Sequence, residues 1–155
     1  MNPTLLAGLG AGLSLFLSGG GSAFATSHAS VFAIRHQDLM AMVPVVQAGV
    51  LALYGVIISY LLAKKVNDNN DMAVVDGYKF LCAGLSVGFA CLASGIGMGI
   101  YLKKLNDLEY YFVRRGMTSP GSASKKGSFL TFILCLIFFE AIGLYGLIVA
   151  LFLVG

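Results

Sequence analysis

A single acidic residue, Glu140, lies in the middle of the otherwise apolar stretch LIFFEAIGLYGLIVALFLV, which covers residues 136–154. Carrying a charge to the centre of a bilayer costs about 2.5 kcal/mol or more, so an acid in such a segment is by default part of a functional site. Burial in lipid favours the neutral acid, and the anion forms only where water or a cationic partner stabilises it. A carboxyl group that alternates between these settings can carry protons. The alternative is a neutral acid that only bonds a neighbouring helix, although a glutamine could do this without the cost of occasional ionisation.

No other chemically active residues have a spacing that predicts a site. The three cysteines, Cys82, Cys91 and Cys135, lie in apolar segments without a C-x-x-C pair and are typical of small packing residues. Neither His28 nor His36 has a second ligand suggested by the sequence, and nothing matches the G-x-x-x-x-G-K-[ST] nucleotide-binding pattern. We therefore expect no metal, no cofactor, no direct binding of ATP and no enzymatic activity in this chain.

The composition is that of a membrane protein. Hydrophobic residues make up 58% of the 155 residues and charged residues only 11%, against about a quarter in ordinary soluble domains. Four segments contain no Lys, Arg or Asp, and each exceeds the roughly 20 residues that cross a bilayer as a helix. The sequence therefore predicts an all-α membrane protein with a single domain, residues 1–155. Its expected helices cover residues 5–34, 39–63, 80–102 and 129–154.

The chain contains an internal repeat. The segment AGLGAGLSLFLSGGGSAF from Ala7 aligns without gaps with AGLSVGFACLASGIGMGI from Ala83, and seven of the 18 positions are identical. In the same way, LYGVII from Leu53 matches LYGLIV from Leu144. The first and third helices are thus related to each other, as are the second and fourth.

These matches predict a tandem-duplicated helical hairpin, with repeat 1 at residues 1–66 and repeat 2 at residues 77–155. The offset is 76 residues for the first pair of helices and 91 for the second, so the connection within repeat 2 is 15 residues longer. Both hairpins then run in the same direction across the membrane. Only repeat 2 carries the acid, because Gly49 occupies the position equivalent to Glu140.

Small residues predict how the helices pack. Glycines recur four residues apart in the first and third helices, and this spacing lets helix backbones approach closely in lipid. We expect these two helices to pack tightly together, with the second and fourth outside them. The predicted packing residues are Gly8, Gly12, Gly84, Gly88, Gly95 and Gly99.

Basic residues predict the orientation in the membrane. Seven Lys or Arg residues fall in the first and third connections and three in the second. This bias places the first and third connections in the cytoplasm and both termini outside or in a lumen. The basic pairs are more typical of such topology signals than of a site for lipid head groups or nucleic acid. We expect no nucleic-acid partner.

Two segments, VPVVQAGVLALYGVII and FFEAIGLYGLIVAL, together with the duplicated glycine-rich helices, closely resemble the proteolipid (c) subunit of the eukaryotic vacuolar-type proton-translocating ATPase. The resemblance covers all four helices. It implies a ring of proteolipid copies in the membrane lipid, identical or mixed, which an ATPase sector turns through a central stalk. The ring moves against a static membrane subunit with an essential arginine. Glu140 falls on the family's proton-carrying glutamate.

The function implied by the resemblance is proton transport out of the cytosol. It would acidify a vacuole or another endomembrane compartment, and partner subunits would hydrolyse the ATP. Two other functions stay open at this point. One is a passive pore, for which these helices offer few polar residues. The other is a structural bundle in which the acid only holds helices together.

The resemblance also suggests what surrounds Glu140. Tyr54 aligns with a second-helix tyrosine that bonds the glutamate in sodium-carrying relatives, so it is a candidate hydrogen-bond partner. The alternative is an aromatic residue that packs between helices. Sodium-carrying relatives surround the glutamate with oxygen ligands, as a hard cation requires. This chain has Leu51, Met98 and Ala141 at those positions, which favours protons over sodium.

Two further residues near the predicted site are polar or aromatic. Gln47 departs from the apolar residue that is usual in the family, and a plain interhelical hydrogen bond is favoured over a role in hydrating or tuning the proton site. Tyr145 is the repeat equivalent of Tyr54 and lies five residues beyond Glu140, on a poorly matched helix face. We expect Tyr145 to be a packing residue.

The third connection, KKLNDLEYYFVRRGMTSPGSASKK, is the largest departure from the family. Relatives have a shorter turn here. The first half of this segment could extend the third helix into the cytoplasm, and its second half is rich in turn-forming residues. We hypothesise that the longer connection alters the surface on which the central stalk sits.

Overall fold

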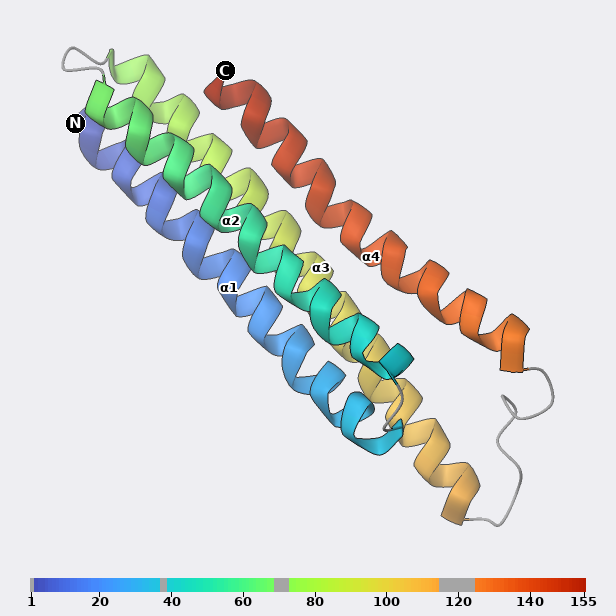
Figure 1. Cartoon of the computed structure of the whole chain (residues 1–155). Helices are drawn as coiled ribbons and strands as arrows, with labels where there is room; N and C mark the ends of the chain where they lie inside the picture. The colour runs from blue at the N-terminus through green and yellow to red at the C-terminus, as the bar shows by residue number, and fades with distance from the viewer. Residues whose placement is uncertain (1, 37–38, 69–72, 115–124) are drawn as a thin grey trace.

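The structure is a computed structural model of the chain, and it describes residues 2–36, 39–68, 73–114 and 125–155 (Figure 1). A short 3₁₀ turn, η1, covers Leu39–Met42 and precedes the second of four long helices. The four α-helices are α1 (Pro3–His36), α2 (Val43–Asp68), α3 (Val74–Arg114) and α4 (Lys125–Val154). Each is long and apolar enough to cross a membrane. The predicted fold class, an all-α membrane protein with four spanning helices, is confirmed.

The helices begin and end at positions that differ from those expected. Helix α2 begins at Val43 instead of residue 39, and Pro44 lies in its first turn, where the missing N–H needs no partner. Helix α3 continues past the apolar segment that ends at Leu102 and reaches Arg114. The interpretation that the first half of the third connection extends this helix is therefore confirmed. Hydropathy marks the membrane-crossing part of a helix, whereas a helix continues as long as its backbone hydrogen bonds are favourable.

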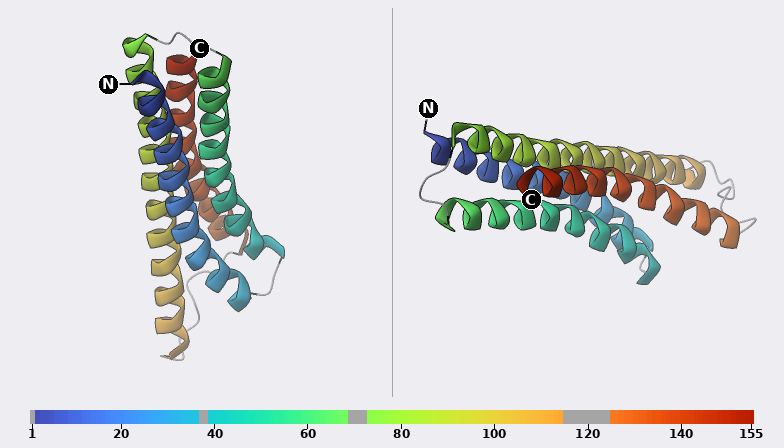
Figure 2. Two further views of the ribbon diagram at one scale, coloured as in Figure 1. Left: turned by 90° about the vertical axis from the view of Figure 1, so that its left-hand side faces the viewer. Right: turned by 90° about the horizontal axis from the view of Figure 1, so that it is seen from above.

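The helices run side by side along one common axis, and both termini lie at the same end (Figures 1 and 2). Helices α1 and α3 share the most extensive contact, followed by α1 with α2 and α3 with α4. Helices α1 and α4 touch through side chains, with the rings of Phe32 and Phe132 stacked 5.2 Å apart. At the end opposite the termini, α3 projects beyond α1 and α2 (Figure 1).

Glycines allow the backbones of α1 and α3 to touch. A Cβ atom at Gly10 would lie 2.6 Å from the carbonyl oxygen of Phe80, and one at Gly84 would overlap the backbone of Gly10. The same relation recurs between Gly21 and Gly95, whose Cβ would overlap the Gly21 backbone. Two further glycines of α3 face side chains of α1, namely Gly88 against Leu17 and Gly99 against Phe24. A larger residue at a glycine that meets backbone forces the two helices apart, whereas at Gly88 or Gly99 the facing side chain must shift.

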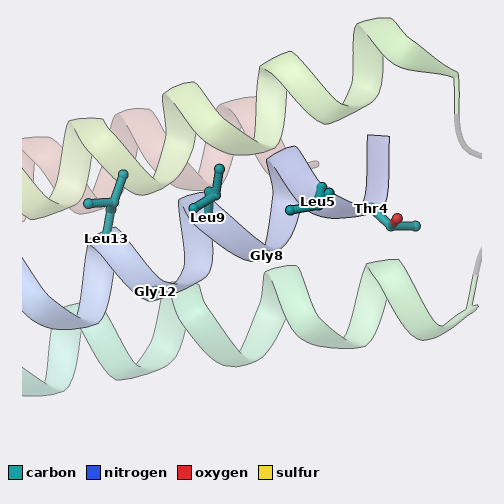
Figure 3. Close-up of a pocket in the computed structure, with 6 residues that line it drawn as sticks. All are labelled: Thr4, Leu5, Gly8, Leu9, Gly12 and Leu13. Carbon is teal, nitrogen blue, oxygen red and sulfur yellow. The ribbon is translucent and has the colours of Figure 1, made fainter. Parts of the chain in front are cut away.

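The glycines of α1 that were predicted to pack do not contact another helix of this chain. A Cβ atom at Gly8 or Gly12 would meet nothing within 4 Å. Figure 3 shows both on α1, where they line an open groove with Thr4, Leu5, Leu9 and Leu13. Spacing alone does not distinguish the α1 glycines in contact with α3, Gly10 and Gly21, from those on the free face.

Serine hydroxyls tie each outer helix to its inner neighbour, but with different registers in the two repeats. In repeat 2, Ser94 donates a hydrogen bond to the carbonyl oxygen of Phe139. The sequence offsets make Ser18 and Ala48 the counterparts of this pair. The Ala48 carbonyl instead accepts a bond of 2.7 Å from Ser22, one helical turn further along α1.

A second pair of contacts shows the same displacement. A Cβ at Gly146 would overlap Ala90, whereas one at its counterpart Gly55 would overlap Ser18. Ser18 lies one turn beyond Ser14, the counterpart of Ala90. Helix α2 is therefore shifted along α1 by about one turn, roughly 5.4 Å, relative to the way α4 packs on α3.

Candidate functional site

Glu140 lies on α4 and faces α2. Its side chain is half-buried, and both carboxyl oxygens have a partner from α2. The amide nitrogen Nε2 of Gln47 lies 2.6 Å from Oε2 of Glu140. The hydroxyl of Tyr54 lies 3.2 Å from Oε1. The geometry therefore brings together one carboxyl group, one amide and one phenol at a contact between two helices that are distant in sequence.

Helical periodicity explains why these two residues of α2 reach the same acid. Gln47, Leu51 and Tyr54 are spaced at i, i+4 and i+7, which places them on one face of the helix. Leu51 is fully buried between the two polar groups, and the side chain of Tyr54 is only 9% exposed. The α2 face toward the acid therefore has a buried apolar residue between its two polar groups.

A glycine one turn after the acid opens the space in which the helices meet. A Cβ at Gly143 would lie 2.8 Å from a methyl carbon of Leu51, and 3.7 Å from both the ring of Tyr54 and the sulfur of Cys91. Helices α2, α3 and α4 therefore converge just beyond Glu140. On the other side of the acid, the bond from Ser94 to the Phe139 carbonyl fixes α4 on α3.

The partners of Glu140 are neutral. Across the part of the chain that the structure describes, the ion pair found is Lys79 with Asp76, at 3.4 Å on the surface, and no cation pairs with Glu140. An ionised carboxylate with only neutral partners in an apolar setting is costly. The arrangement suits a protonated acid, which a cation from outside the chain, or water, could convert to the anion.

The residues that the sequence placed near the acid differ in what they do. Tyr54 makes the longer of the two contacts, and Gln47, for which only an interhelical bond was favoured, makes the shorter one. The bond of Gln47 is interhelical, and its partner is the acid itself. The signal available in the sequence was that Gln47 shares a helix face with Leu51 and Tyr54. Tyr145, the repeat equivalent of Tyr54, is 65% exposed on the surface of this chain.

The structure offers few oxygen ligands for a cation. Leu51 and Met98 are fully buried apolar residues. Met98 belongs to a cluster with Ala25, Ala48 and Leu136. No group of three or more His, Cys, Asp or Glu residues that could hold a metal ion occurs among the described residues.

Comparison with known proteins identifies the family. The family model for the C subunit of ATP synthase matches residues 117–153, which include Glu140. The human 16 kDa proteolipid of the V-type proton ATPase, its c subunit, is 36% identical over 151 residues, which is 94% of this chain and 88% of the human one. The chain belongs to the V-type proton ATPase proteolipid family. This confirms the resemblance that the sequence motifs suggested.

Fungal proteolipids match over a shorter part of their length. The c′ subunit of the V-type proton ATPase of Saccharomyces cerevisiae is 38% identical over 115 residues, which is 74% of this chain and 62% of the yeast one. The corresponding c subunit of Candida tropicalis is 42% identical over 112 residues, which is 72% of this chain and 61% of the relative. This proteolipid thus spans less than two thirds of these fungal relatives in the alignments.

Proposed function

We propose that this proteolipid carries protons in the membrane rotor ring of a vacuolar-type ATPase. The observation that supports the proposal best is the setting of Glu140, the one acid in the apolar part of the chain, with neutral partners on both carboxyl oxygens. In this role the chain is not itself an enzyme. Partner subunits hydrolyse ATP, and the energy reaches the ring as rotation.

The chemistry of one cycle follows from the two settings of the carboxyl group. While the proteolipid faces lipid, Glu140 stays protonated, because an anion would have neither water nor a cation beside it. When rotation brings it to the static membrane subunit, the essential arginine and the water of a half-channel stabilise the anion, and the proton leaves. A proton from the other half-channel neutralises the acid before it returns to lipid. Ring, static subunit, central stalk and ATPase sector are the partners that this cycle requires.

The location follows from the same proposal. Protons would move out of the cytosol into a vacuole or another acidified endomembrane compartment. Both termini, the end of α2 and the start of α3 would lie on the lumenal side, because they share one end of the bundle (Figure 1). The α1–α2 and α3–α4 connections, which hold most of the basic residues, would lie in the cytoplasm.

A structural bundle is the alternative that the geometry also permits, because the bonds of Gln47 and Tyr54 to Glu140 join α2 to α4. The two functions differ in what they require of residue 140. A structural contact needs a hydrogen-bonding group, which an amide supplies. A proton carrier needs a group that gains and loses a proton.

The test is the variant Glu140→Gln in the complete complex, reconstituted in vesicles with the ATPase sector outside. We expect the complex to assemble and ATP-driven acidification to fall to background. The matched control is Asp76→Asn, the same chemical change at an exposed acid, which should pump at close to the normal rate. Acidification at the normal rate by an assembled Glu140→Gln complex would refute the proposal.

The same vesicles test the orientation. An impermeant amine reagent should label Lys103 and Lys104 rather than Lys64, and the reverse pattern would overturn the orientation.

A further inference from the structure

The amide of Gln47 is only half satisfied by the contacts of the site. Its nitrogen lies 2.6 Å from Oε2 of Glu140. Its oxygen, Oε1, is buried and has no hydrogen-bond partner. A buried amide oxygen without a partner is unfavourable, and such an atom beside a functional carboxyl group calls for an explanation.

The distance between the amide and the carboxyl group distinguishes two kinds of bond. Bonds from N–H to oxygen usually measure 2.7–3.2 Å, whereas O–H to oxygen bonds measure 2.5–3.0 Å. The 2.6 Å between Gln47 and Glu140 falls in the second range alone. A half-turn of the amide exchanges its oxygen and nitrogen and leaves the shape of the side chain unchanged. Oxygen then faces oxygen at this distance.

With the amide turned, the hydrogen bonds match a neutral acid. A protonated carboxyl group has one O–H donor and a carbonyl oxygen that accepts. Oε2–H of Glu140 donates to Oε1 of Gln47, and Oε1 of Glu140 accepts from the hydroxyl of Tyr54. The amide oxygen gains a partner, and the amide nitrogen takes the place that the oxygen had.

We propose that Gln47 is a positioning residue. Its amide oxygen accepts a hydrogen bond from the protonated carboxyl group of Glu140 and thereby keeps the neutral acid in contact with α2. This inference rests on the proposed function, because it describes how the proton carrier is kept loaded between the half-channels. By the family resemblance, an apolar residue is usual at the position of Gln47. The hydrogen bond is therefore a property of this chain and adds to the contact from Tyr54.

Few other ionisable groups can contribute to a pH dependence at this site. From α2, Tyr54 faces the acid, and from α3, the sulfur of Cys91 lies next to Gly143. Tyr101 of α3 packs on Phe139, with ring centres 5.9 Å apart. Helix α1 contacts α4 through Phe32, whose ring stacks on Phe132, eight residues before Glu140, and also packs on His36 at 4.2 Å. A change in pH dependence on altering Gln47 can therefore be assigned to Glu140.

The experiment measures how fast a hydrophobic carbodiimide, which reacts with protonated carboxyl groups, modifies Glu140 as the pH is varied. The assembled complex in membranes is used, and modification is followed by the mass of the fragment that contains residue 140. In Gln47→Met the acceptor is lost and an unbranched side chain of similar length remains. We expect the midpoint of the labelling curve to move to lower pH by about half to one unit, the value of one ordinary hydrogen bond.

The controls separate this role from packing. Val46→Met places the same side chain on the neighbouring residue, which is 66% exposed, and should leave the midpoint unchanged. Gln47→Asn keeps an amide but withdraws it by one methylene, so it should shift the midpoint in the same direction as Gln47→Met. A lower yield of complex in both Gln47 variants with an unmoved midpoint would show that Gln47 only packs, and would overturn the inference.

Two outcomes distinguish this inference from the proposed function. If Glu140→Gln abolishes acidification but Gln47→Met leaves the midpoint in place, the proton carrier stands and the role of Gln47 is rejected. If sodium ions protect Glu140 from the carbodiimide in the normal chain but not in Gln47→Met, the amide oxygen is a cation ligand, and the inference is likewise rejected. A downward shift of the midpoint that sodium does not alter supports it.

Discussion

Glu140 is held by hydrogen bonds from neutral groups, not by an ion pair. This choice of partners matters because a buried lysine or arginine would fix the carboxylate in its charged form. An amide and a phenol form only ordinary hydrogen bonds with the acid, so the acid can remain neutral. In the proposed cycle, the carboxyl group would leave this site by breaking two weak hydrogen bonds, and water and a cation at the static subunit would compensate for their loss.

The two partners of Glu140 should contribute unequally. The hydroxyl of Tyr54 lies 3.2 Å from the carboxyl oxygen, beyond the usual range of O–H to oxygen bonds. We expect Tyr54→Phe to lower the initial rate of ATP-driven acidification by about twofold, the value of a weak hydrogen bond. Its effect on the carbodiimide midpoint should be smaller than that of Gln47→Met.

Tyr145 provides a matched control for this prediction. It is the repeat equivalent of Tyr54, and its side chain is exposed on the surface of the chain. Tyr145→Phe should acidify vesicles at the normal rate. Equal losses in the two variants, or a larger midpoint shift from Tyr54 than from Gln47, would contradict the ranking of the two bonds.

The sequence predicted the acid more easily than it predicted the surroundings of the acid. A lone carboxylate in an apolar segment is recognisable because of its transfer cost alone. The contact of Gln47 depends also on how far α2 has slid along its neighbours, and a displacement of one turn would bring a different residue to the carboxyl group. The spacing of Gln47, Leu51 and Tyr54 predicts a shared face, but not the depth of that face in the bundle.

At the scale of the elements, the two repeats use the same kinds of residue in different ways. The α3 glycines Gly84 and Gly95 touch the backbone of α1. Their sequence counterparts, Gly8 and Gly19, have free space around them within this chain. A duplicated sequence has thus produced one packed glycine face and one open face. The packed face makes the pairing of α1 with α3 the most extensive contact of the bundle.

This asymmetry predicts opposite responses to the same substitution. In Gly84→Ala the new methyl group would overlap the backbone of Gly10, so the helices must separate, at a cost on the order of 1–3 kcal/mol. In Gly8→Ala the methyl group meets nothing in the chain, and alanine slightly favours the helix. Thermal unfolding of the single chain in detergent should therefore occur at a lower temperature for Gly84→Ala only. Equal destabilisation by both variants would show that the α1–α3 contact does not depend on this glycine.

The existence of the helices was predictable from the sequence, whereas their ends were less so. Uninterrupted apolar segments longer than a bilayer is thick can only be helices in lipid, so all four were expected. The start of α2 moved to Val43, where a proline fits the first turn, and α3 continued to Arg114 on polar residues that carry no hydropathy signal. The one-turn displacement of α2 on α1 arises from side-chain fit and is not readable from the repeat alignment.

At the scale of the whole molecule, the extension of α3 changes the end of the bundle that we assign to the cytoplasm. Arg35, in the last turn of α1, donates a hydrogen bond of 3.0 Å to the backbone carbonyl of Asn106. This contact lies beyond Leu102, so a hydrogen bond connects the polar part of α3 with the end of α1. At the opposite end, Lys65 of α2 donates to the carbonyl of Val154 near the end of α4. Both ends of the bundle therefore have interhelical polar links.

The long connection of repeat 2 should matter for how the ring is driven and not for how the acid is held. Glu140 and its partners depend on contacts within the apolar part of the chain. The connection follows α3 at the end of the bundle that we assign to the cytoplasm, where the proposed central stalk would bind. Removing residues 110–124, which restores the length of the connection in repeat 1, should therefore leave carbodiimide labelling of Glu140 intact. It should lower the number of protons pumped per ATP hydrolysed, because the ring would slip against the stalk.

The measurement is the ratio of acidification to ATP hydrolysis in the same vesicles. A second variant, in which residues 110–124 are replaced by a Gly/Ser segment of equal length, separates length from sequence. If this variant couples normally while the deletion does not, spacing between the ring and the stalk is what the connection provides. If both lose coupling, the residues themselves form part of the binding surface. A deletion complex with an unchanged ratio would show that the connection has no role in coupling, and the hypothesis would fail.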